Sequence, residues 1–203
     1  MKVNFNEKMY EIINSFEATP RLLIHSCCAP CSSHVLSLLS NYFEITVLYY
    51  NPNIEPIEEY EKRKAEQIRF IKEYKGKNSI DLMDIDYENK TYRDYVKGLE
   101  DIPEGGARCN KCFYLRLEKT AKLAKENSYD FFGTTLTVSP YKNHLIINTI
   151  GEELSKKYNI KFLYSDFKKQ DGYKNSIDLS KKYNLYRQHY CGCLFSKEVE
   201  INE

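Results

Sequence analysis

Long hydrophobic runs are missing from this sequence. Its uninterrupted apolar stretches stop well short of the roughly 18 residues that a membrane-spanning helix needs, so a membrane protein is excluded. The first eight residues, Met1–Lys8, also lack an apolar segment behind a basic start, which gives no indication of a secretory signal. The sequence therefore predicts a cytoplasmic protein with no membrane partner.

An excess of charge of either sign is also absent. Thirty Lys and Arg residues balance 29 Asp and Glu residues, which leaves a formal net charge of +1. The whole-molecule field therefore gives no strong reason to expect a polyanionic partner, and any nucleic-acid site must be a local patch. Residues 151–190 carry nine Lys and Arg against five Asp and Glu, and Lys168 and Lys169 within them are candidate phosphate contacts.

Tryptophan, internal repeats, low-complexity tracts and flexible linkers are absent too. The 18 Tyr residues are suited to stacking on bases, but a codon bias toward A and T gives the same enrichment. With 42% apolar residues, a chain of 203 residues can bury a sizeable core as one domain. We expect a single α/β domain over residues 1–203, with a basic, Tyr-rich segment, 167–203, packed on it.

Short apolar runs alternate with segments of helical periodicity. The expected strands are Leu22–His25, Ile45–Tyr50, Ile80–Asp86, Phe131–Val138 and Ile160–Tyr164. The expected helices are Glu7–Phe16, one that begins near Pro30, Ile57–Lys75, Lys111–Lys125 and Asn143–Tyr158. Such alternation is typical of right-handed βαβ units, so the sequence predicts a parallel sheet in three layers, with helices on both faces.

Cysteine is the informative residue type. The seven cysteines form three groups, which are Cys27, Cys28 and Cys31; Cys109 and Cys112; Cys191 and Cys193. An odd number in an expected cytoplasmic chain does not suit an extracellular disulfide framework. Free structural cysteines have no reason to gather in sequence, so three groups far apart along the chain predict convergence on one site.

Thiolates in this number favour zinc or an iron–sulfur cluster. A structural zinc site needs four ligands and would leave three thiols without a task, so the surplus favours redox chemistry. Cys27 and Cys28 follow an expected strand, where open α/β sheets bind ligands, and the Ala29-Pro30 step allows the turn that would let both side chains meet one centre. Cys109 and Cys112 are three residues apart at an expected helix start, where both face one side.

Six segments resemble the QueH-type epoxyqueuosine reductases. They are His25–Cys31 (HSCCAPC), Tyr50–Ile54 (YNPNI), Arg108–Phe113 (RCNKCF), Thr134–Leu136 (TTL) with Ser139-Pro140, Asp166–Lys169 (DFKK) and Tyr186–Cys193 (YRQHYCGC). The resemblance covers about Leu22 to Ser196. It implies reduction of the epoxide of epoxyqueuosine, in the wobble position of a tRNA anticodon, to the alkene of queuosine, without cobalamin.

The resemblance also implies a cofactor and a set of site residues. It makes Cys27, Cys28, Cys109 and Cys112 the ligands of a 4Fe-4S cluster, and it joins Cys191 and Cys193 in a redox-active disulfide that serves catalysis. Cys31 is left without a role; a place beside the cluster or at an additional iron ion is open, and so is that of a buried helix cysteine. The implied partners are tRNA, through its anticodon loop, and an external electron donor.

The fold further resembles that of the PP-loop adenine-nucleotide hydrolases. There the loop after the first strand is glycine-rich and cradles pyrophosphate, whereas Cys27, Cys28 and Pro30 occupy it here. Use of ATP is therefore not expected.

Other polar residues are weaker candidates. Asp84 and Asp86 are possible proton donors or oxygen ligands, although solvated or capping carboxylates are the favoured interpretation. Four single histidines suit packing or surface roles better than ligation, and they are His25, His34, His144 and His189. His189 lies beside the last cysteine pair and could move protons. Arg187 and Lys142 could hold phosphates of the anticodon loop, with ordinary surface roles as the alternative.

Two functions of other classes fit the same cysteines. One is a zinc-stabilised tRNA-binding module without chemistry of its own, which predicts a colourless protein that contains zinc. The other is a PP-loop-like tRNA sulfur transferase, which requires ATP and uses a cysteine pair to carry persulfide.

Overall fold

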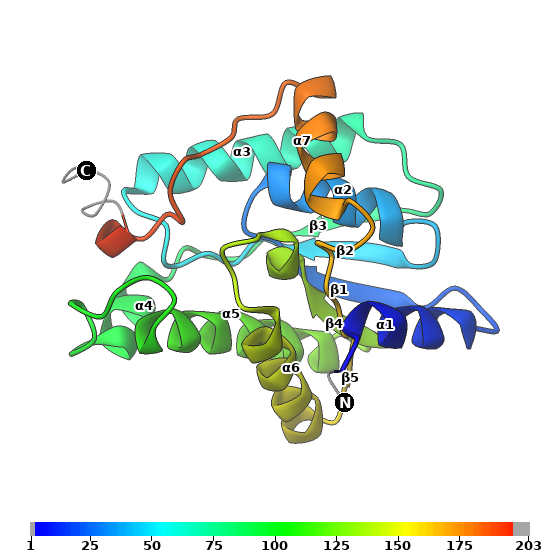
Figure 1. Cartoon of the computed structure of the whole chain (residues 1–203), viewed down its shortest axis with the longest axis horizontal. Coiled ribbons are helices and arrows are strands. Elements are labelled where there is room, and N and C mark those ends of the chain that lie inside the picture. The colour runs from blue at the N-terminus through cyan, green and yellow to red at the C-terminus, as the bar shows by residue number, and fades with distance from the viewer. Residues whose placement is uncertain (1–2, 197–203) are drawn as a thin grey trace.

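Five parallel strands form one sheet, in the order β3-β2-β1-β4-β5 (Figure 1). The computed structural model describes residues 3–196. The strands are β1 (Arg21–His25), β2 (Glu44–Leu48), β3 (Ile80–Met83), β4 (Phe131–Thr134) and β5 (Lys161–Phe162). All four pairings are parallel, so the predicted α/β architecture with a parallel sheet is confirmed.

Helices precede, connect and follow the strands within the described residues. They are α1 (Phe5–Asn14), α2 (Ala29–Leu39), α3 (Ile57–Glu73), α4 (Asn89–Val96), α5 (Ala107–Glu126), η1 (Thr135–Val138), α6 (His144–Tyr158) and α7 (Gly172–Lys182). In residues 3–196 no helix is both long enough and apolar enough to cross a membrane.

Helices cover both faces of the sheet. Leu22 and Ile24 of β1 belong to a core that includes Leu36 of α2, whereas Leu23 belongs to a second core with Leu117 of α5. Successive side chains of a strand point to opposite faces, so β1 supplies both cores. Figure 1 shows α2 and α3 on one side of the sheet and α5 and α6 on the other. The predicted three-layer arrangement follows from this alternation.

The fourth strand is shorter than the sequence predicts. The expected run Phe131–Val138 is a strand only to Thr134, after which the chain turns into η1. The Thr134 hydroxyl accepts a hydrogen bond from the Leu136 N–H at 3.2 Å and so caps η1. This local bond competes with strand pairing, which is why the β-branched residues after Thr134 leave the sheet.

Three further boundaries differ from expectation. The expected strand Ile80–Asp86 ends at Met83, and Ile160–Tyr164 contributes only two residues to the sheet. The expected helix Lys111–Lys125 begins four residues earlier, at Ala107. Cys109 and Cys112 therefore lie within the first two turns of α5, where both can face the same side.

The strand order reverses between β1 and β4. β1 leads into α2, and β4, its neighbour on the other side from β2, leads into η1 and α6. His25 and Thr134, the last residues of these strands, are register partners. Such a reversal leaves a crevice beyond the carboxyl ends of the strands. Cys27 and Cys28 come directly after β1 and so lie at this crevice.

The chain after β5 folds back over the first face of the sheet. Helix α7 packs on α2 (Figure 1), and Leu185 is part of the core on that face. Arg69 of α3 donates hydrogen bonds to the carbonyls of Tyr183 at 3.0 Å and Asn184 at 3.1 Å. These contacts carry the last cysteine pair back to the crevice. Residues 197–203 of the expected C-terminal segment lie outside the described residues.

Candidate functional site

Three thiols meet at the start of α2. The sulfurs of Cys27, Cys28 and Cys31 all lie within 4.8 Å of one another, and those of Cys27 and Cys28 are 3.8 Å apart. Cys28 is the extended residue before α2, and Ala29 is the first residue of the helix. The backbone thus changes from strand to helix at this pair, which supplies the turn that the sequence requires and brings in Cys31, whose role the sequence leaves open.

In the thiol triad, Cys27, Cys28 and Cys31, hydrogen bonds between the thiols shift the pKa of each cysteine. Hydrogen bonds from the Cys28 and Cys31 thiols hold the pKa of Cys27 well below its usual value. The same bond to Cys27 raises the pKa of Cys28 to about 12. The Gln188 side-chain amide donates a hydrogen bond to the Cys28 sulfur at 2.9 Å, so the triad is tied to the C-terminal segment. A soft metal ion is the partner that suits several such thiolates at once.

The other four cysteines line a second, smaller space. Cys109, Cys112, Cys191 and Cys193 surround a cavity of about 70 Å³. Cys109 accepts a hydrogen bond from the Gly105 N–H at 3.2 Å, and burial raises the pKa of Cys112 to about 12. All seven cysteines are free thiols. Among the described residues, the thiols of Cys27, Cys28 and Cys31 lie close enough together to hold one ion. Cys109 and Cys112 instead face the neighbouring cavity.

The two spaces adjoin. A cavity of about 590 Å³ is lined by Cys27 and Cys31, and it shares Arg116, Lys142 and Cys191 with the smaller cavity. The three cysteine groups, which come from the ends of β1, α5 and the C-terminal segment, therefore face one continuous region at the crevice. This is the convergence that the clustering in sequence predicts.

Two cations accompany the thiols. Arg116 is only 1% exposed and donates a hydrogen bond to the Cys112 carbonyl at 3.1 Å. Burial lowers the pKa of Arg116 and of Lys142, but the nearby thiols, with Cys27 and Cys191 common to both, outweigh burial and raise both pKa values. Both side chains therefore stay charged, and they offset the negative charge that metal-bound thiolates would bring into a buried site.

A third cation, Arg63, positions the last cysteine pair. Arg63 of α3, 2% exposed, donates hydrogen bonds to the carbonyls of Cys191 at 3.2 Å and Tyr190 at 3.4 Å. Gly192 has φ +118°, and a Cβ there would lie 2.9 Å from Ile54 and 3.0 Å from Arg63. Glycine is thus required between the two cysteines, both for its backbone conformation and for the close approach of Arg63.

Arg63 and Arg116 are site residues that sequence reasoning missed. Each lies in a charged amphipathic helix, where an arginine is ordinarily a solvated residue. One signal was available for Arg116, because it directly precedes Leu117 on the apolar side of its helix and is four residues beyond Cys112.

Comparison with known proteins agrees with this arrangement. The family model described as "Epoxyqueuosine reductase QueH" matches residues 22–199. The chain belongs to the epoxyqueuosine reductase QueH family. The QueH protein of Staphylococcus epidermidis is 42% identical over 202 residues, which are 96% of this chain and 85% of that protein. Those of Streptococcus pyogenes and Thermotoga maritima are 40% and 36% identical, covering 98% and 86% of this chain and 80% and 89% of theirs.

The two candidate aspartates, Asp84 and Asp86, lie away from the cysteine cavities of this QueH family member. Asp84 and Asp86 are exposed and line a separate depression beside α3 rather than either cysteine cavity. Asp84 forms an ion pair with Lys64 at 2.6 Å. Neither carboxylate lines a cysteine cavity, which fits the favoured interpretation of Asp84 and Asp86 as solvated carboxylates. The reason is that β3 ends at the sheet edge, away from the reversal between β1 and β4.

Three of the four histidines also lie outside the two cavities. His25 is buried between the Thr134 hydroxyl and the Tyr50 carbonyl, both at 3.1 Å, and burial lowers its pKa to about 3, so it is neutral. His34 lies in a depression against α7, and His144 lies 3.7 Å from Asp166.

His189 and Arg187 line the larger cavity, as Lys142 does. Lys168, in contrast, is held by Asp166 at 3.1 Å and donates to the Thr137 carbonyl at 3.4 Å. The cavity cations are therefore the ones that lie beside the thiols, whereas Lys168 makes contacts within the protein and its role as a phosphate contact, with that of the exposed Lys169, stays a prediction.

Proposed function

We propose that this chain reduces the epoxide of epoxyqueuosine in tRNA to the alkene of queuosine at its cysteine-lined cavities. The observation that carries this proposal is the convergence of three cysteine groups, the buried Arg116 and the half-buried Lys142 on one crevice, in a chain that belongs to a family of that name. A cytoplasmic location, where such a substrate occurs, remains a prediction.

We infer that Cys27, Cys28, Cys109 and Cys112 hold a 4Fe-4S cluster. The donor set fits this group, because all the thiols are free and soft, and Arg116 and Lys142 offset the charge of bound thiolates. Cys31, which shares the triad, is then available to an additional iron ion. A cluster bound there would supply electrons one at a time.

The chain's own residues can balance the reaction. Turning an epoxide into an alkene takes two electrons and two protons and releases the oxygen as water. When the thiols of Cys191 and Cys193 join in a disulfide, they release two electrons and two protons, and an external donor must then reduce them again. His189 is exposed and lines the larger cavity, so it is placed to pass protons between solvent and substrate.

The larger cavity suits part of a nucleic acid. The cations Arg63, Arg116, Lys142 and Arg187 line it together with one acidic residue, Glu104, although the net charge of the chain is only +1. Buried thiols cannot reach a base that is stacked in an anticodon loop. We therefore infer that the modified base leaves its stack and enters the cavity while the cations attract neighbouring phosphates.

The two competing functions make different predictions. A likeness to the PP-loop fold, which we retain as a proposal, would allow a sulfur transferase that uses ATP. The first turn of α2 contains Pro30, which has no N–H to offer a phosphate, and this argues against ATP. A zinc-stabilised binding module would need no redox-active pair, and the Cys191–Cys193 segment held by Arg63 favours the reductase.

Protein purified without oxygen should be brown, with iron and acid-labile sulfide bound and a broad visible absorption that bleaches on reduction. The reason is charge transfer between thiolates and iron. Metal and sulfide analysis together with the spectrum checks this. Stoichiometric zinc without sulfide would support the binding module instead, and a requirement for ATP in turnover would support the sulfur transferase.

A further inference from the structure

An aromatic side chain stands at the mouth of the cavities. Tyr141 is 82% exposed, the highest value among the large hydrophobic residues that the structure describes as exposed. It lines both the larger and the smaller cavity. Most other tyrosines described are buried or half-buried, so codon bias alone does not explain why this ring is left in solvent beside the thiols.

A tight turn presents this ring. The Lys142 N–H donates to the Ser139 carbonyl at 3.3 Å, which closes a four-residue turn with Pro140 and Tyr141 at its centre. Proline fixes the backbone at the second position of such a turn. Directly after the turn, the Asn143 side chain accepts hydrogen bonds from the Leu145 and Ile146 N–H groups, at 3.0 and 3.4 Å, and so starts α6.

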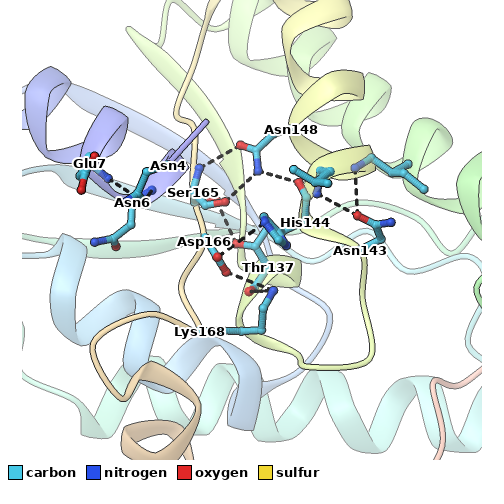
Figure 2. Close-up of polar contacts among 12 residues, drawn as sticks. Asn4, Asn6, Glu7, Thr137, Asn143, His144, Asn148, Ser165, Asp166 and Lys168 are labelled. Atoms are coloured by element: carbon cyan, nitrogen blue, oxygen red, sulfur yellow. Dashed lines mark hydrogen bonds and ion pairs between the residues drawn. The ribbon is translucent and has the colours of Figure 1, made fainter. Parts of the chain in front are cut away.

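A polar network fastens the elements on both sides of the turn (Figure 2). Asn148 of α6 donates to the Ser165 carbonyl at 2.8 Å and accepts from the Ser165 N–H at 3.0 Å. The hydroxyls of Thr137, in η1, and Ser165 lie 2.9 Å apart. Since η1 and α6 share the partner Ser165, the turn between them is held at both ends, and the backbone of Tyr141 loses little conformational freedom when the ring binds a ligand.

The last two residues of the turn, Tyr141 and Lys142, serve different regions. The Lys142 amine lies near the sulfurs of Cys27, Cys31 and Cys191, whereas the Tyr141 ring is in solvent at the rim. A nucleotide whose base has been withdrawn into the cavity leaves the adjacent base with one face unstacked, and an exposed aromatic ring on a held turn at the mouth can cover that face.

We propose that Tyr141 is a stacking platform for the unpaired base that flanks the reacting nucleotide of the anticodon loop. This proposal rests on the proposed function, because it takes tRNA as the substrate. It assigns base stacking to Tyr141 and phosphate attraction to Arg187, which lines the larger cavity from the C-terminal segment.

The test uses the anaerobically purified full chain and an anticodon stem-loop RNA that carries epoxyqueuosine. Tyr141→Ala should weaken binding about 5- to 150-fold, the range expected for one lost base–aromatic stack. Tyr141→Phe should bind as the wild type does, and Tyr141→Leu should bind as weakly as the alanine variant. The slope of log Kd against log salt should stay unchanged in all three, since no charge is removed.

Two control variants separate base stacking from phosphate attraction and from apolar contact outside the cavities. Arg187→Gln removes a phosphate contact and should lower the salt slope by about 0.7. Leu145→Ala removes another exposed apolar side chain, 41% exposed, that lies near the turn but does not line either cavity, and it should bind normally.

Unchanged affinity in Tyr141→Ala would overturn the proposal, and so would full affinity in Tyr141→Leu, which would indicate a general apolar contact. A wild-type protein that converts the tRNA while Tyr141→Ala does so with the same KM would refute the platform and leave the proposed function standing. A wild-type protein that neither binds nor converts the tRNA would refute the function itself.

Discussion

Replacing Cys28 by Ser should remove iron and sulfide from the anaerobically purified protein and lower turnover more than about 100-fold. Cys28 is 1% exposed, its sulfur lies 3.8 Å from that of Cys27, and a hydroxyl is a poor ligand for iron in a cluster. Loss of a residue that only hydrogen-bonds to a metal ligand typically costs roughly 10- to 100-fold in metal affinity or activity. Loss of a ligand itself should therefore cost more. The same result is expected for Cys27, Cys109 and Cys112.

Cys31→Ser is the matched control for these variants. It also removes a thiol from the triad, but the proposed ligand set does not include it, so cluster content should be retained. Iron and sulfide analysis of both variants, with circular dichroism to confirm folding, decides the matter. If the Cys31 variant lost the cluster while the Cys28 variant kept it, the ligand assignment would be wrong and Cys31 would replace Cys28 among the ligands.

Cys191→Ser and Cys193→Ser should keep the visible spectrum of the cluster but stop after one turnover. Arg63 and Gly192 hold this segment beside the smaller cavity, where a pair that relays electrons must lie. A disulfide between cysteines with one intervening residue closes a very small, strained ring and is easily reduced, which suits a relay. The measurement is product formed per protein molecule under single- and multiple-turnover conditions.

Ser196→Ala provides the control for the relay variants. It removes a hydroxyl 3.5 Å from the Cys193 sulfur but leaves both thiols, so multiple turnover should continue. Loss of iron and sulfide from either cysteine variant would place the pair among the ligands and contradict the relay.

Much of the fold was predictable because its central strands are buried on both faces. Leu22–His25 and Ile45–Tyr50 read as continuous apolar runs, and they are β1 and β2 within one or two residues. The expected strand Phe131–Val138 was too long for a local reason, because the Thr134 hydroxyl caps η1 and ends β4. No periodicity in apolar residues records such a side-chain bond.

The cysteine site was predictable in outline because unligated thiols have no reason to cluster in sequence. Its surroundings were not. Arg63 contacts the carbonyl of Cys191, 128 residues away, and Arg116 lies near Cys27 and Cys191, which are far from it in the sequence. Partners this distant are set by tertiary packing, which a pattern in one helix does not report. The place of Cys31 likewise depends on the abrupt change from strand to helix at Cys28.

The most direct test of the account is the conversion of its substrate. tRNA that carries epoxyqueuosine is incubated without oxygen with the purified protein and a low-potential chemical reductant, then digested to nucleosides and analysed by mass spectrometry. The account predicts that epoxyqueuosine disappears and that a nucleoside lighter by one oxygen atom, queuosine, appears in equal amount, with no requirement for ATP or cobalamin. Unchanged epoxyqueuosine from protein that contains iron and sulfide would contradict it.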